Sequence, residues 1–203
     1  MRARVVVLAA VAVFVTAATL TAFTLLVGKR TTTGVQQVSG VADVGGPFTL
    51  TDETGKTVTE ADLLGKPSAI FFGFTFCPDV CPTTLYEMSG LIDKLGQDAD
   101  RVNWVFVSVD WQRDGPEELR EYLNAFDERI RGFSGTEEQI ETVTKAYKVF
   151  YERVPTEDGD DYTINHTASV LLMDEEGRFF GTLGYGEDPE VMHDKLKRLV
   201  AGT

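Results

Sequence analysis

The sequence has very few of the residues that build disulfide frameworks and metal sites: only two cysteines and two histidines among 203 residues. Two cysteines cannot form a disulfide scaffold, and two histidines leave few combinations of metal ligands. Basic residues are also scarce beyond residue 30, where 15 lysines and arginines stand against 32 acidic residues. Because a phosphate backbone requires a basic surface, this balance disfavours a nucleic-acid partner and the binding of anionic lipid by the folded part.

Charged residues, glycine and proline are all absent from Val5 to Val27, and basic residues close both ends of this run. As a helix, this stretch would be about 34 Å long, enough to cross a hydrocarbon core of about 30 Å. A cleaved signal peptide would have a shorter apolar stretch and a small-residue cleavage site. We therefore expect a retained membrane anchor over residues 1–30, with a transmembrane helix over about 5–27. The flanking charges do not settle its orientation.

The rest of the chain divides into a linker and one domain. Residues 31–46 (TTTGVQQVSGVADVGG) are predicted to be a flexible linker because they are rich in Thr, Gly and Gln. Residues 47–203 alternate apolar runs typical of buried strands with helical spacing, which indicates an α/β domain with a mixed sheet. We expect hairpins over 48–58 and 168–183, strands over 68–76 and 102–109, a short strand or turn over 131–135, and helices over 83–95, 116–126, 136–150 and 188–200.

Both cysteines lie in one short motif, Phe76-Cys77-Pro78-Asp79-Val80-Cys81-Pro82, between a predicted buried strand and a predicted helix. The partial positive charge of a helix N-terminus stabilises a thiolate and lowers the pKa of the thiol. A thiolate is the nucleophile in disulfide exchange and also a soft ligand for copper. Since the four-residue spacing lets both sulfurs face the same way on one helical turn, they would either close a small disulfide ring or chelate one metal ion.

His166 is the histidine best placed to join the two sulfurs. It stands directly before the predicted strand 168–173, and in thioredoxin-like folds the loop before that strand faces the cysteine helix. Two thiolates and one imidazole suit copper in either oxidation state. A tetrahedral zinc site would also need His193, which we expect on the surface of the last helix. Inert buried thiols, a structural disulfide and a hydrogen-bonding His166 are the alternatives. We expect Met88 and Met192 in the core rather than at a metal.

Several long motifs of this chain resemble the SCO/SenC family of copper-binding thioredoxin-like proteins, over about residues 47–200. They are FFGFTFCPDVCPTTL at 71–85, SVD followed by Arg113-Asp114 at 108–114, FSGTEEQI leading to AYKVFY at 133–151, and DYTINHTASVLLMDEEG at 161–177. The resemblance implies a thioredoxin-like fold with a mixed central sheet and flanking helices. An N-terminal membrane anchor is also usual in the family.

By this resemblance, one copper ion, Cu(I) or Cu(II), binds to Cys77, Cys81 and His166. Family members help to assemble the binuclear CuA centre in subunit II of cytochrome c oxidase, by delivering copper, by reducing the target cysteines, or by both. The resemblance also points to Asp110 as a residue near the copper or in partner interaction, with a strand-end cap as the alternative. The sequence departs from the family here, because Trp111 stands where proline is common.

We therefore expect a membrane-anchored copper metallochaperone, a binding protein rather than an enzyme, in a bacterial inner membrane with its domain in the periplasm. The alternative is a thiol–disulfide oxidoreductase that uses Cys77 and Cys81 to keep the cysteines of the oxidase copper site reduced. A thiol peroxidase is disfavoured because both cysteines share one motif. Besides subunit II, another periplasmic copper chaperone or a thiol reductase is the expected partner.

Overall fold

The computed structural model describes residues 43–156, 159 and 161–203. The predicted anchor over residues 1–30 and most of the predicted linker lie outside this range. In the described part of the chain, no helix is both long and apolar enough to cross a bilayer. The anchor therefore stays a prediction from the sequence.

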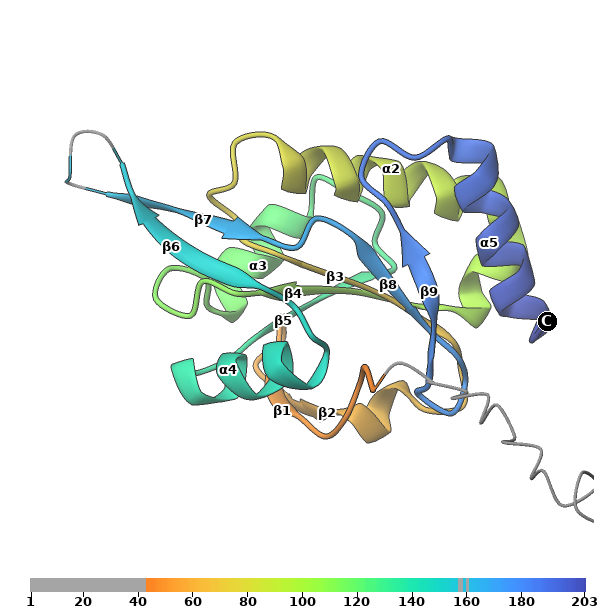
Figure 1. Ribbon diagram of the computed structural model, residues 1–203, viewed down its shortest axis with the longest axis horizontal. Helices are drawn as coiled ribbons and strands as arrows, with labels where there is room; N and C mark the ends of the chain where they lie inside the picture. The colour runs from red at the N-terminus through yellow and green to blue at the C-terminus, as the bar shows by residue number, and fades with distance from the viewer. Residues whose placement is uncertain (1–42, 157–158, 160) are drawn as a thin grey trace, which may run out of the picture. The chain divides into compact units, whose positions relative to one another are not determined.

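Seven strands form one mixed sheet, and two further strands form a separate ribbon (Figure 1). The order across the sheet is β2-β1-β5-β4-β3-β8-β9, and β6 pairs with β7. The central strands β3, β4 and β5 are parallel, whereas the neighbours on both sides run antiparallel. The strands are β1 Thr49–Asp52, β2 Thr57–Thr59, β3 Ser68–Gly73, β4 Asn103–Ser108, β5 Ile130–Ser134, β6 Tyr151–Pro155, β7 Tyr162–His166, β8 Val170–Met173 and β9 Phe179–Leu183.

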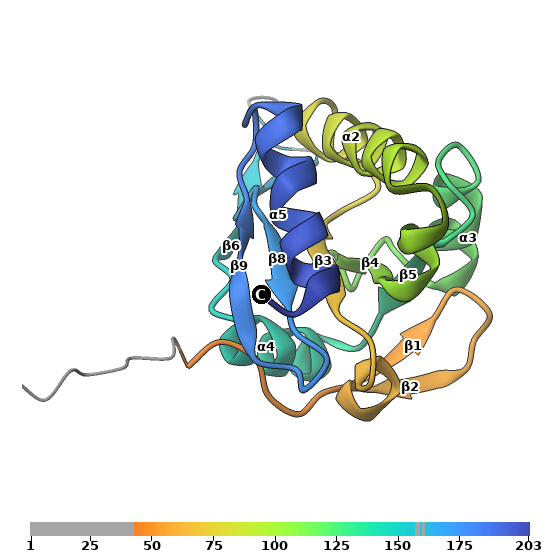
Figure 2. The same ribbon diagram turned by 90° about the vertical axis from the view of Figure 1, so that its right-hand side faces the viewer.

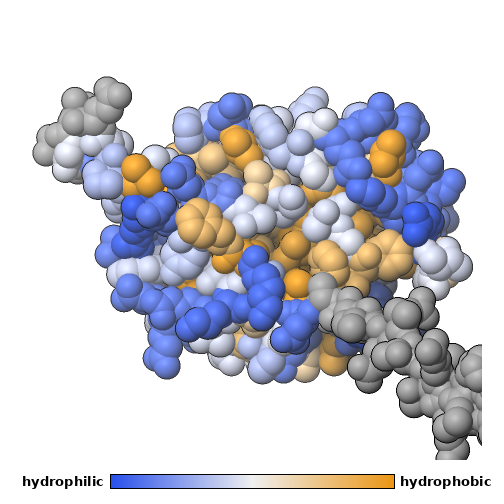
Figure 3. All heavy atoms as spheres, in the orientation of Figure 1, coloured by the Kyte–Doolittle hydropathy of each residue, from blue (hydrophilic) through white to orange (hydrophobic). Residues whose placement is uncertain are grey.

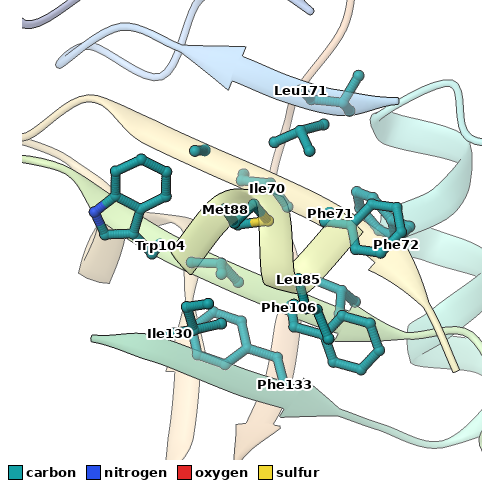
Figure 4. Packing of buried hydrophobic residues seen from close by; sticks show 14 of the residues in the cluster. Ile70, Phe71, Phe72, Leu85, Met88, Trp104, Phe106, Ile130, Phe133 and Leu171 are labelled. Carbon is teal, nitrogen blue, oxygen red and sulfur yellow. The ribbon is translucent and has the colours of Figure 1, made fainter. Parts of the chain in front are cut away.

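The strands β3 and β4 occupy the centre of the sheet because their sequences are almost continuously apolar. All six residues of β3 are buried, and five of the six residues of β4 are buried. A parallel pair of this kind needs cover on both faces. Figure 4 shows Leu85 and Met88 of the first long helix projecting toward these strands, beside Phe106. Met88 and Met192 are 1% and 3% exposed, which confirms that both methionines belong to the core.

The helices lie on both faces of the sheet. They are η1 Glu60–Leu63, α2 Val80–Leu95, η2 Gly96–Arg101, α3 Pro116–Leu123, α4 Glu137–Ala146 and α5 Pro189–Ala201. Helix α2 packs against α5, and these two lie with α3 on one side of the sheet while α4 covers the other side (Figures 1 and 2). Right-handed β-α-β crossovers place α2 and α3 on the same face. Helix α4 begins at its predicted N-cap, Thr136, whose hydroxyl accepts from the backbone N–H of Gln139.

The main difference from the predicted elements is the ribbon of β6 and β7. We expected a loop before β8. Between Tyr162 and His166 only Ile164 is strongly apolar, so the sequence gives little sign of a strand there. Instead this segment pairs with β6 in antiparallel register, from Tyr151 opposite His166 to Pro155 opposite Tyr162. His166 therefore stands at the end of a strand, and its direction is set by the ribbon.

The described chain enters the domain at the end of the sheet opposite to the cysteines. Gly45 donates its backbone N–H to the carbonyl oxygen of Ala146 at 3.0 Å and lies against Met173. Met173 pairs with Ser68, the first residue of β3, whereas the cysteine motif follows the last residue of β3. On the face of the domain seen in Figure 3, the rim is hydrophilic and apolar side chains are visible over the region of β8 and β9.

Candidate metal centre

The two cysteines occupy different positions at the start of α2. The helix begins at Val80, three residues earlier than predicted, so Cys81 lies in its first turn and Cys77 precedes it. The backbone N–H of Cys81 donates to the sulfur of Cys77 at 3.3 Å. Because N–H groups of the first turn have no partner within the helix, the sulfur of Cys77 satisfies one of them in place of a cap. The predicted arrangement of both sulfurs on one helical turn is thus wrong in detail.

The two thiols have very different acidities because they share one proton. The hydrogen bond from Cys81, supported by His166 and by backbone N–H groups, lowers the pKa of Cys77 to about 4 against the opposing effect of burial. The same interaction with Cys77, together with burial, raises the pKa of Cys81 far above its ordinary value. Cys77 is half-buried and Cys81 is fully buried. The reduced pair therefore holds a thiolate near the surface and a thiol beneath it.

The imidazole of His166 faces the sulfurs with one defined nitrogen. Its Nε2 lies 3.3 Å from Sγ of Cys81, and its Nδ1 lies 3.0 Å from the carbonyl oxygen of Thr167. A carbonyl oxygen only accepts, so Nδ1 is the donor to Thr167 and Nε2 is the nitrogen that faces the cysteines. The rings of Phe71 and Phe74 meet the imidazole edge-on, with centroids 6.0 and 5.8 Å away. These contacts fix the ring plane.

Cys77, Cys81 and His166 thus converge on one point, with all three ligand atoms within 4.8 Å of one another. Among the described residues, no other group of Cys, His, Asp and Glu side chains has this arrangement. Two sulfur ligands and one imidazole are soft to borderline donors, a set that suits copper. The fourth ligand of a tetrahedral zinc site is not assembled, because His193 lies on α5 beside Asp194. Its side chain is 16% exposed, so His193 lies partly buried on α5 and outside the group of ligand atoms.

Two residues that support the cysteines were not found from the sequence. Gly73 leaves room for the buried sulfur, since a Cβ at this position would lie 2.8 Å from Sγ of Cys81. Asp114 is buried and accepts hydrogen bonds from the hydroxyl and backbone N–H of Thr75, at 2.6 and 2.8 Å. Thr75 is two residues before Cys77, so Asp114 fixes the approach to the cysteine motif. An aspartate within the motif at 108–114 was the available signal.

Asp110 is outside the group of ligand atoms but is connected to the strand that carries His166. Its carboxylate is fully buried and accepts from the hydroxyl of Tyr162 at 2.7 Å and from Nε of Arg113. The predicted alternative of a strand-end cap describes its backbone only, because its carbonyl oxygen accepts the N–H groups of Arg113 and Asp114. The side chain of Asp110 therefore acts on the ribbon through Tyr162, the first residue of β7.

A family model described as SCO1/SenC matches residues 36–201. The chain belongs to the SCO1/SenC family. Among curated members, protein SenC of Rhodobacter capsulatus is 38% identical over 159 residues, which cover 78% of this chain and 71% of SenC. The mitochondrial SCO1 homolog 1 of Arabidopsis thaliana is 38% identical over 157 residues, 77% of this chain and 47% of that relative. The chain thus spans about half the length of this Arabidopsis relative.

Solved structures of SCO1/SenC proteins have the same fold. The structure of Bradyrhizobium japonicum ScoI with copper bound is 49% identical in sequence, with a TM-score of 0.72, and covers 77% of this chain and 99% of that chain. Yeast Sco1 with copper bound is 36% identical, with a TM-score of 0.73, over 79% of this chain and 90% of that chain. The predicted thioredoxin-like fold with a mixed sheet and flanking helices is confirmed.

Proposed function

We propose that this protein is a copper metallochaperone that binds one copper ion through Cys77, Cys81 and His166. The convergence of these three ligand atoms within 4.8 Å carries the proposal. Nδ1 of His166 is held by the carbonyl oxygen of Thr167, so Nε2 is the nitrogen that is oriented toward the sulfurs and able to bind a metal. The copper-bound ScoI and Sco1 structures, at 49% and 36% identity, support the choice of metal.

Copper binding of this kind is coupled to the redox state of the cysteines. A disulfide between Cys77 and Cys81 has no thiolate to offer, so only the reduced protein takes up the ion. The thiolate at Cys77 is half-buried and is the first sulfur an incoming ion meets, while Cys81 gives up its proton on binding. Copper then leaves by stepwise exchange of these ligands with those of an acceptor.

The proposed acceptor is the CuA centre in subunit II of cytochrome c oxidase, the target that the family resemblance implies. We propose that residues 5–27 anchor the chain in a bacterial inner membrane and that the domain of residues 47–203 lies in the periplasm. Carrier and acceptor would then stand above the same membrane, which confines their encounter to one surface. Another periplasmic copper chaperone or a thiol reductase would load or reduce the site.

The test is a copper titration of the reduced protein, followed by its absorption spectrum. We expect one copper per chain and, with Cu(II), a sulfur-to-copper charge-transfer band. His166→Ala should weaken binding by at least about tenfold and change this band. His193→Ala is the matched control, because it removes the other histidine and should leave both unchanged. Failure of the reduced protein to bind copper at equal concentrations would rule out this function.

The second candidate function is a thiol–disulfide oxidoreductase that reduces the cysteines of the oxidase copper site. The specific observation in its favour is the acidic thiol of Cys77 beside the protonated Cys81, the arrangement of a nucleophile and its resolving thiol. This reaction requires both cysteines but does not require a metal ligand at His166. Reduction of an acceptor disulfide by His166→Ala at the wild-type rate would favour this candidate, whereas a loss equal to that of Cys77→Ser would exclude a purely redox role.

A further inference from the structure

Few helices and strands of the domain contact the ribbon that carries His166. Its strands β6 and β7 pair with each other and form a two-stranded sheet of their own. A two-stranded ribbon is at best marginally stable alone, so side-chain contacts must fix its position. Alternate residues of a strand face the same side, which places Tyr162, Ile164 and His166 together. Arg153 of β6 is opposite Ile164 in the register.

Aromatic rings and guanidinium groups alternate between this ribbon and the loops beside the metal centre. We call the five residues Phe76, Arg113, Tyr162, Arg153 and Trp111 the ring–cation stack. The guanidinium carbon of Arg113 lies 4.6 Å from the centre of the Phe76 ring and 3.8 Å from that of Tyr162. That of Arg153 lies 4.9 Å from the Tyr162 ring and 4.3 Å from the Trp111 ring. The stack thus joins the cysteine motif, the loop after β4 and both strands of the ribbon.

The carboxylate of Asp110 balances the positive charges of the two arginines in the stack. This fully buried carboxylate binds Arg113 and Tyr162, and Nη2 of Arg153 lies 3.7 Å from it. Arg113 also forms an ion pair with Asp161 at 3.0 Å. Nη2 of each arginine is buried and has no hydrogen-bond partner among the described residues. Aromatic faces and the charge of Asp110 therefore hold both cations, and Asp161 adds to the hold on Arg113. A cation–π contact is stronger where water is excluded.

We propose that Arg153 and Trp111 are positioning residues for the metal centre. Arg153 stacks on Tyr162 within the ribbon and on Trp111 of the loop after β4, and this contact holds the ribbon so that Nε2 of His166 stays on the sulfur of Cys81. This role rests on the proposed copper function and adds to it the part of the chain that places the third ligand. The His166 end of β7 is four residues from Tyr162, a distance of about 13 Å along the strand. A displacement of the ribbon at the stack is therefore transmitted along β7 to the imidazole.

Arg153→Met is the variant that isolates this role. It removes the charge and keeps most of the side-chain length, while Asp110 keeps its ion pair with Arg113 and is not left as an unpaired buried charge. Arg153→Lys keeps the charge and should restore part of the effect. Arg198→Met is the matched control, because the guanidinium carbon of Arg198 lies over the ring of Phe180, 5.9 Å from its centre. Arg198 belongs to α5 and Phe180 to β9, so this contact is outside the ribbon.

The first measurement is Cu(I) affinity of the reduced protein in competition with a chelator. We expect Arg153→Met to bind about three- to tenfold more weakly than wild type, Arg153→Lys to lie between them, and Arg198→Met to match wild type. In a His166→Ala background the same change should have no further effect, because its influence passes through the imidazole. Wild-type affinity in Arg153→Met, or an equal loss with and without His166, would overturn the proposal.

The second measurement uses the metal-free protein, so that it decides the proposal even if copper binding itself is disproved. Arg153→Met and Trp111→Ala should each speed hydrogen exchange of the ribbon amides, at Thr163 and Asn165, by about threefold or more. The amides of β3 and β4 should exchange as in wild type. Unchanged exchange in the ribbon, or an equal increase across the central sheet, would show that the stack does not position the ribbon.

Discussion

Gly73 and Cys81 are in such close contact that a Cβ on Gly73 would lie 2.8 Å from the buried sulfur and 2.8 Å from the ring of Phe106. We predict that Gly73→Ala displaces the sulfur, costs about 1–3 kcal/mol of unfolding free energy and weakens copper binding. Chemical denaturation and a copper titration measure these effects. Gly90→Ala is the control, because nothing lies within 4 Å of its Cβ and alanine is the better helix former. Normal affinity in Gly73→Ala would contradict the argument.

The acidity of Cys77 predicts the pH dependence of its alkylation in the reduced, metal-free protein. Its pKa of about 4 lies below the ordinary 9.0, so it should react with iodoacetamide at pH 5–6 and lose this reactivity only as the pH falls through about 4. The corresponding contribution to stability is complete above the ordinary thiol pKa of 9.0, falls progressively as the pH is lowered, and is lost once the pH has passed through about 4. Cys81 should stay unmodified. Mass spectrometry locates the label, and a midpoint near 9 in the native protein would refute the assignment.

Asp114 should stabilise the fold through the segment that leads to Cys77. Its carboxylate accepts two hydrogen bonds from Thr75 and one from the hydroxyl of Ser108, at 2.6 Å. Asp114→Ala leaves the backbone N–H of Thr75 without its acceptor, so we expect a loss of about 2–3 kcal/mol in unfolding free energy. Thr75→Val removes only the hydroxyl bond among the three and should cost about 1 kcal/mol. Equal stability of the two variants in urea denaturation would speak against this role.

Met88 and Met192 offer a test of packing against metal binding. Both are buried, and both line one small cavity with Leu91 and Val170. Met88→Leu and Met192→Leu conserve volume and should each cost less than about 1.5 kcal/mol of unfolding free energy. Because neither sulfur is assigned to copper, the number of ions bound per chain should stay at one. A lower stoichiometry in either variant would make that methionine a ligand.

The central elements were predictable because their patterns are strong. The continuous apolar runs of β3 and β4 require burial on both faces, and Thr136 and Asp188 are N-cap residues that start α4 and α5. The ribbon was not predictable in the same way. β7 buries only Ile164 fully, so its pairing depends on the ring–cation stack and on β6 rather than on a local pattern.

The metal centre was predictable in its three members but not in its geometry. The motif around Cys77 and Cys81 and the position of His166 sufficed to select the residues. The start of α2 at Val80 was hidden by Pro82, which suits the first turn of a helix as well as a loop before one. The sequence pattern predicts neither the close contact at Gly73 nor the hydrogen bond between the imidazole and the carbonyl oxygen of Thr167. Both depend on backbone positions that are set only when the chain has folded.

Gly45 lies against Met173, beside the first residue of β3, and the sulfurs follow the last residue of that strand. The chain thus enters the domain at one end of β3, and copper would be exchanged at the other end. Whatever the length of the linker, its point of attachment to the domain does not obstruct the end that carries the cysteines. An acceptor would then approach the end of the domain that carries the cysteines. Shortening the linker should limit the distance over which that end can meet an acceptor, and should leave its affinity for copper unchanged.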